Sequence, residues 1–174
     1  MASKRWKVAS LAGCVAVACA PALDWREFVP EGSGLHVAFP CRPDRVVRSV
    51  VLAGLPAQMS MLTCRSEDVT YAVGFVEVAD PQRIAPALGE LRASALNNVG
   101  ASQVEAGPAG ISGMTANDQA SRVRMAGHLP DGAAIQEQAV FFTRGLHVYQ
   151  AAMIGVRLEP HDIRTFFDAL RFPA

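Results

Sequence analysis

Lysine is almost absent from this chain of 174 residues, where it occurs only at Lys4 and Lys7. Sixteen lysine and arginine residues balance sixteen acidic residues, so the chain lacks the basic excess that is typical of nucleic-acid-binding proteins. Charged residues make up only 18 % and hydrophobic residues 51 %, which excludes wholesale disorder and provides for a core. The length suits one ordinary domain.

Motifs that carry catalysis or hold cofactors are also missing. The sequence contains no P-loop, no dinucleotide fingerprint, no C-x-x-C pair and no G-x-S-x-G; the segment 110–113 departs from the last of these. The histidines are scattered and none forms a pair at metal-ligand spacing: His36, His128, His147 and His161. We therefore expect no metal, no cofactor and no nucleic-acid partner.

No apolar run is long enough for a stable transmembrane helix, which needs about 20 residues. The N-terminus instead has a basic start up to Lys7, an apolar centre of 11 residues over 8–18, and small residues after it. This three-part order is typical of an export signal. We predict that residues 1–22 are a leader and that residues 23–174 form a single domain; a buried N-terminal helix or a retained anchor is the alternative.

Without the leader, 13 arginines face 16 acidic residues, so the domain carries a net charge of −3. The segment Leu11–Cys14 resembles a bacterial lipobox, but it follows Lys7 closely, whereas Cys19 has the better spacing and a weaker box. Lipidation of Cys19 would remove Cys14 and leave an even number of cysteines. We expect a periplasmic protein anchored to the envelope membrane through Cys19 (or Cys14). Ordinary signal cleavage, giving a soluble periplasmic or secreted protein, is the alternative.

Alternating apolar residues predict short strands separated by turns. The first four are expected to form an antiparallel meander, and the last two a hairpin that places Phe141 opposite Val148. The segment 103–115 is expected to be an irregular strand or a long loop. Apart from that segment, the expected strands cover residues 35–39, 46–53, 58–64, 69–78, 120–129, 134–143 and 146–154.

Two segments have helical periodicity. Apolar residues recur at helical spacing from Ile84 to Val99, after the capping residue Asp80, and Pro86 suggests that the helix proper begins near it. A second stripe covers 159–170. Because both faces of the last two strands are apolar, both need a cover. The predicted fold is therefore α+β, an antiparallel sheet of about seven to eight strands covered by two helices.

The start of the domain has a distinctive pattern. Trp25 and Phe28 form a W-x-x-F element, an E-G turn follows at Glu31, and a strand ends in F-P-x-x-P over 39–43. This pattern resembles a group of uncharacterised exported or lipid-anchored bacterial proteins. The order of elements over the whole chain is similar to the PsbP-like α/β/α fold. The resemblance implies an envelope protein and carries no photosystem function, because fold does not fix function.

Cys41 and Cys64 are the remaining cysteine pair. Cys41 follows the first expected strand and Cys64 ends the third, so both fall at the same end of an antiparallel meander. Two such positions can come within the Cα separation that a disulfide needs. We predict a structural disulfide between them.

Four residues are candidates for ligand binding. Arg122 and Arg124 project to the same side of one strand and could meet an anionic group, while His147 and Tyr149 could line a groove. We expect a non-catalytic binding or accessory module for an envelope protein or a small ligand. The alternative is a hydrolase or redox enzyme whose site joins His147, Tyr149 and Arg124.

Overall fold

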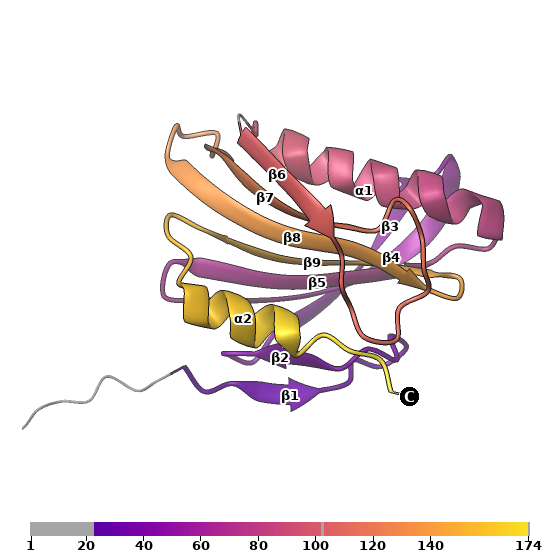
Figure 1. The fold of residues 1–174 in the computed structure, drawn as a ribbon, viewed down its shortest axis with the longest axis horizontal. Helices are drawn as coiled ribbons and strands as arrows, with labels where there is room; N and C mark the ends of the chain where they lie inside the picture. The colour runs from indigo at the N-terminus through magenta and orange to yellow at the C-terminus, as the bar shows by residue number, and fades with distance from the viewer. Residues whose placement is uncertain (1–22, 102, 174) are drawn as a thin grey trace, which may run out of the picture.

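A seven-stranded antiparallel sheet forms the centre of the structure, a computed structural model that describes residues 23–101 and 103–173 (Figure 1). The strand order is β3-β4-β5-β9-β8-β7-β6, and β1 and β2 form a separate two-stranded sheet. The predicted α+β class is confirmed. The strands are β1 (Arg26–Phe28), β2 (Val37–Phe39), β3 (Asp44–Leu52), β4 (Leu55–Ser66), β5 (Val69–Glu77), β6 (Gln103–Pro108), β7 (Ser121–His128), β8 (Ala134–Arg144) and β9 (His147–Gly155).

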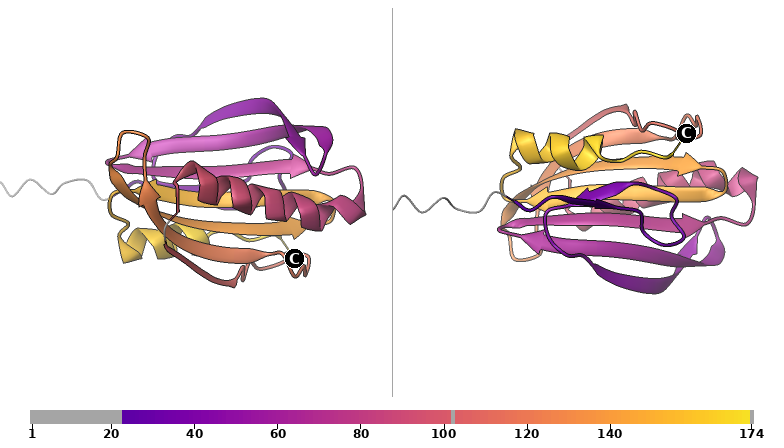
Figure 2. Two further views of the ribbon diagram at one scale, coloured as in Figure 1. Left: turned by 90° about the horizontal axis from the view of Figure 1, so that it is seen from above. Right: turned by 90° about the horizontal axis from the view of Figure 1, so that it is seen from below.

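Both faces of the large sheet are covered. Helix α1 (Ile84–Asn98) lies on one face, and helix α2 (Pro160–Asp168) lies beside the β1–β2 sheet on the other (Figure 2). Alternate residues of the central strands β4, β5, β8 and β9 enter one or the other of two hydrophobic clusters, as a period of two requires. The α1 side includes Val123, Met125, Ile135, Ala139, Phe141, Val148 and Ala152. The α2 side includes Leu62, Tyr71, Val73, Phe75, Val140, Phe142, Tyr149 and Met153.

Helix α1 begins earlier than the position of Pro86 suggested. The 3-10 turn η1 (Pro81–Arg83) precedes it, and the Asp80 carboxylate accepts a hydrogen bond from the Gln82 amide at 2.9 Å. The α-helix then begins at Ile84, which makes Pro86 its third residue. Since the first four amides of a helix have no intrahelical acceptor, proline removes nothing at this position.

The expected four-strand meander is wrong in its first strand. Only β3, β4 and β5 are consecutive neighbours in the large sheet, whereas β2 pairs with β1. All three residues of β2 are buried, and Phe39 contacts the rings of Phe28 and Phe166 at centroid distances of 5.9 and 5.8 Å. This segment is therefore part of the layer that covers the sheet. Its alternating pattern predicted a strand and could not specify its neighbours.

The β8–β9 hairpin differs from the prediction by a shift of two residues. Arg144 lies opposite His147, and Phe141 lies opposite Gln150 instead of Val148. The two turn residues are Gly145 and Leu146, and Gly145 has a φ of +57° that glycine adopts readily. A shift of two leaves every side chain on its predicted face, so the apolar pattern does not distinguish the two registers.

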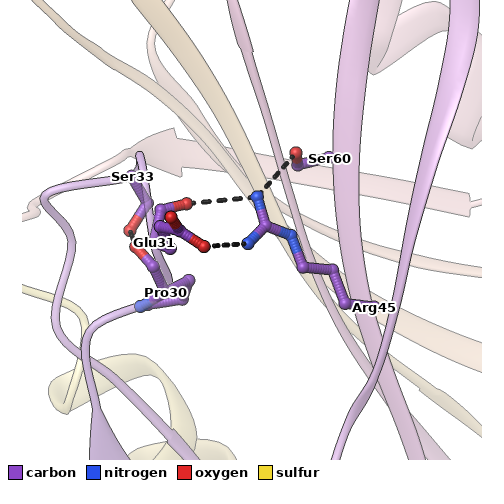
Figure 3. Close-up of polar contacts among 5 residues, drawn as sticks. All are labelled: Pro30, Glu31, Ser33, Arg45 and Ser60. Atoms are coloured by element: carbon purple, nitrogen blue, oxygen red, sulfur yellow. Dashed lines mark hydrogen bonds and ion pairs between the residues drawn. The ribbon is translucent and has the colours of Figure 1, made fainter.

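The covering layer is tied to the sheet at two places. The Arg45 guanidinium on β3 donates to the carboxylate and the carbonyl of Glu31, both at 3.3 Å, and to the Ser60 hydroxyl at 3.4 Å (Figure 3). The segment after β2 is joined to β4 by the Cys41–Cys64 disulfide, with a Cα separation of 6.0 Å. The structure thus contains the predicted disulfide.

Candidate functional site

A shallow groove of about 270 Å³ lies over β6, β7 and β8 on the face of the sheet that also carries α2. The pairing register places Glu105 of β6, Arg124 of β7 and Gln138 of β8 in one row across the three strands. Gly107 and Arg122 occupy the next row toward α2. The three strands therefore direct polar side chains into the same space.

Arg122 is the least compensated charge of the groove. Its guanidinium lies over the Phe167 ring of α2, 4.9 Å from the centroid, and the residue is half-buried. None of the described residues forms an ion pair with it. Burial lowers the pKa of Arg122 below its usual range, and the carboxylate of Asp168 only partly opposes this effect. A half-buried cation that has no ion-pair partner favours the approach of an anion.

Gln138 supplies a second unsatisfied group. The residue is only 4 % exposed, and its Oε1 is a buried acceptor without a hydrogen-bond partner among the described residues. Buried polar atoms in folded proteins nearly always have a partner, so an orphaned acceptor in a groove wall calls for one. A ligand hydroxyl or N–H group that displaces the atoms covering Oε1 would supply the missing donor.

Gly107 leaves the floor of the groove open. A Cβ atom added at this position would have no neighbouring atom within 4 Å apart from the adjacent residues. Beside it, Arg124 forms an ion pair with Glu105 at 3.5 Å, with both side chains largely exposed. Such an exposed pair is weak and exchanges readily with other partners, so Arg124 can also contribute to the recognition of an anion.

His147 and Tyr149 lie elsewhere on the same face. They line a separate hollow together with Arg144 and Phe172. The Tyr149 hydroxyl donates to the Ser33 carbonyl at 2.7 Å, and burial raises the pKa of this phenol to about 12. Tyr149 is therefore a buried structural residue and is not poised as a base.

Arg124 is not part of that hollow. Four residues along β9 and two strand spacings separate the rows of Arg124 and Tyr149, which corresponds to roughly 16 Å. The four candidate residues thus divide into two places: Arg122 and Arg124 in the groove, and His147 and Tyr149 in the hollow. Of the three residues named for the hydrolase or redox alternative, His147 and Tyr149 line one hollow, and Arg124 does not.

The sequence pointed to both groove arginines and did not point to Gln138. Gln136 and Gln138 alternate on one strand, a pattern that suggests the solvent-exposed rim of a sheet. Gln136 is indeed exposed, whereas Gln138 is buried. Its neighbours across the sheet are Arg124 of β7 and Met153 of β9, and a pattern of alternating residues on one strand does not report how closely such neighbours cover it.

The described residues contain no group of three histidine, cysteine or acidic side chains that could hold a metal ion. Within the same residues, no helix is long and apolar enough to cross a membrane. The predicted lipidation positions, Cys19 and Cys14, lie outside the described residues. A scan against protein-family models finds no match for the sequence, and a search of curated proteins finds none.

Proposed function

We propose that this chain is an exported, lipid-anchored and non-catalytic binding module of the bacterial envelope, and that its groove binds a small anionic ligand. The observation that carries the binding role is the combination of a half-buried cation without an ion-pair partner among the described residues, Arg122, and an orphaned acceptor, Gln138 Oε1. Together they suit an acid that has a hydroxyl or N–H donor beside its anionic group.

The envelope location rests on other features. The leader over 1–22, the position of Cys19 and the resemblance of the W-x-x-F and F-P-x-x-P elements all favour export with lipid anchoring. The Cys41–Cys64 disulfide is compatible with an oxidising compartment outside the cytoplasm. A ligand-binding domain held at the membrane by several acyl chains is the arrangement that these features support.

Glycolate and acetate are a matched pair of probes for the groove, because only glycolate has a hydroxyl beside its carboxylate. In an NMR titration we expect glycolate to bind roughly fivefold more tightly than acetate, from one additional hydrogen bond to Gln138. Gln138→Leu should abolish this preference. Arg122→Met should weaken the binding of both acids roughly tenfold, because it removes the charge-assisted contact.

Two further variants separate binding from folding. Gly107→Val fills the open floor without removing a polar group, and it should block both acids while leaving the spectrum of the folded domain intact. Arg48→Met on β3 removes one exposed arginine away from the groove and should leave both affinities unchanged. Undiminished binding by Gly107→Val, or shifts centred on His147, would contradict the assignment of the groove.

Anchoring is tested by the mass of the mature N-terminus after expression of the full chain in a bacterial host. We expect a chain that begins at an acylated Cys19 and partitions with membranes. The Cys19→Ala variant should lose the acyl mass and the membrane fraction together, whereas Cys14→Ala should keep both. An acylated Cys14, or an unmodified cleaved terminus, would refute the assignment to Cys19.

A further inference from the structure

The outermost strand β3 leaves a long apolar edge of the sheet open. It has nine residues, contains neither proline nor glycine, and pairs only with β4 on its inner side. Three of its valines are exposed, Val46 by 43 %, Val47 by 54 % and Val51 by 74 %. Proteins usually protect such edges with prolines, bulges or a covering element, because an open edge can pair with another strand.

The turn after β3 determines which backbone groups face outward. Ala53 and Gly54 both have positive φ, 50° and 77°, as in a two-residue type I′ turn. The flanking Leu52 and Leu55 are opposite each other and form the hydrogen-bonded pair that closes such a turn. Hydrogen-bonded and non-hydrogen-bonded residue pairs alternate along an antiparallel ladder. The even-numbered residues of β3, like Leu52, therefore direct their amides and carbonyls to β4. Those of Arg45, Val47, Ser49 and Val51 therefore point away from the sheet.

The charged residues of this edge strand are one acid and two arginines, Asp44, Arg45 and Arg48. Arg45 is held by Glu31 on the covering layer (Figure 3). Arg48 is exposed, and it forms no ion pair with any residue that the structure describes. An incoming strand would thus meet outward backbone groups, valine side chains and one free guanidinium.

We propose that β3 is a docking edge, where an extended segment of a partner polypeptide adds an antiparallel strand to the sheet. The segment has apolar residues opposite Val46 and Val50 and an acidic residue opposite Arg48. Backbone hydrogen bonds to the odd-numbered residues supply affinity, and the acidic residue supplies selectivity. This role is additional to the groove, which lies at the other end of the strand order.

A second copy of the chain fits this edge less well. A symmetric antiparallel pair that uses the whole of β3 is centred on Arg48 and places this residue opposite its own copy. Like charges directly opposite each other destabilise a strand pair. The arginine that disfavours self-pairing is the residue that an acidic partner segment would satisfy.

A nine-residue peptide, with glutamate at its centre and valine two residues to either side, tests the proposal by NMR titration of the isotope-labelled protein. We expect shifts in β3 and roughly fivefold weaker binding when lysine replaces the central glutamate. Val47→Pro removes one outward amide without removing a hydrogen bond to β4. It should weaken the binding of the glutamate peptide at least about fivefold. The matched Val47→Thr variant keeps the amide and should bind within about twofold of the native chain.

Three results would overturn the proposal. The first is the absence of shifts at millimolar peptide, and the second is shifts centred on β6 or the groove instead of β3. The third is a concentration-dependent change of the β3 signals without peptide, lost in Val47→Pro, because it would identify a second copy as the occupant.

Discussion

Replacing Glu137 with glutamine is expected to raise the free energy of unfolding by about 2–3 kcal/mol at about pH 8. Glu137 is only 3 % exposed on β8, between Met125 and Ile154 of the neighbouring strands. None of the described residues donates a hydrogen bond to it. Burial raises the pKa of this carboxyl to about 7, from an ordinary value of 4.5.

The sign of the pH dependence follows from this shift. Between pH 4.5 and about 7 the folded protein binds more protons than the unfolded chain, so stability falls as the pH rises. Below this window the native chain and Glu137→Gln should have similar stability. Above this window the folded native chain holds a buried carboxylate, whereas the variant holds a neutral amide, so the variant should be the more stable of the two.

Urea denaturation at a series of pH values measures both curves. The variant should show a flatter profile than the native chain, and Glu77→Gln on the exposed side of β5 should reproduce the native profile. A native profile that does not decline from pH 5 to pH 8 would contradict the buried, unpaired state of Glu137. Glu137→Leu provides a second variant without any polar group at this position.

Removing the Cys41–Cys64 disulfide is expected to lower the free energy of unfolding by about 3 kcal/mol. The two cysteines are 23 residues apart, and a cross-link of this span restricts the unfolded chain by that amount in the chain-entropy model. The double variant Cys41→Ala/Cys64→Ala should therefore unfold at a midpoint about 6–12 °C lower.

A reducing agent provides the internal control for this prediction. It should lower the stability of the native chain to that of the double variant and leave the double variant unchanged. Cys41→Ala alone should be destabilised about as much as the double variant, since either change removes the same cross-link. A native chain insensitive to reduction would show that the disulfide contributes no stability.

Local sequence patterns predicted much of the fold because they report side-chain periodicity. The stripe from Ile84 to Val99 and the stripe over 159–170 correspond to α1 and α2. The alternation on β8 and β9 assigned Phe142 and Tyr149 to one face correctly. Even the wrong hairpin register preserved those faces, because the error was an even number of residues.

The candidate site was less accessible to sequence reasoning. Arg122 and Arg124 are two residues apart on one strand, so a common face follows from strand geometry alone. That Arg122 lies against Phe167 depends on α2, which follows in the chain only after two further strands. No local pattern reports such contacts.

The sequence by itself determined the α+β class, the two helices, the faces of the paired strands and the cysteine pair. Each of these depends on periodicity or on composition. Only the tertiary structure decided that β2 leaves the large sheet, that Glu137 and Gln138 are both buried, and that the ligand candidates divide between a groove and a hollow. The physical reason is that the burial of a polar residue is set by the layers packed over it, and here those layers come from distant parts of the chain.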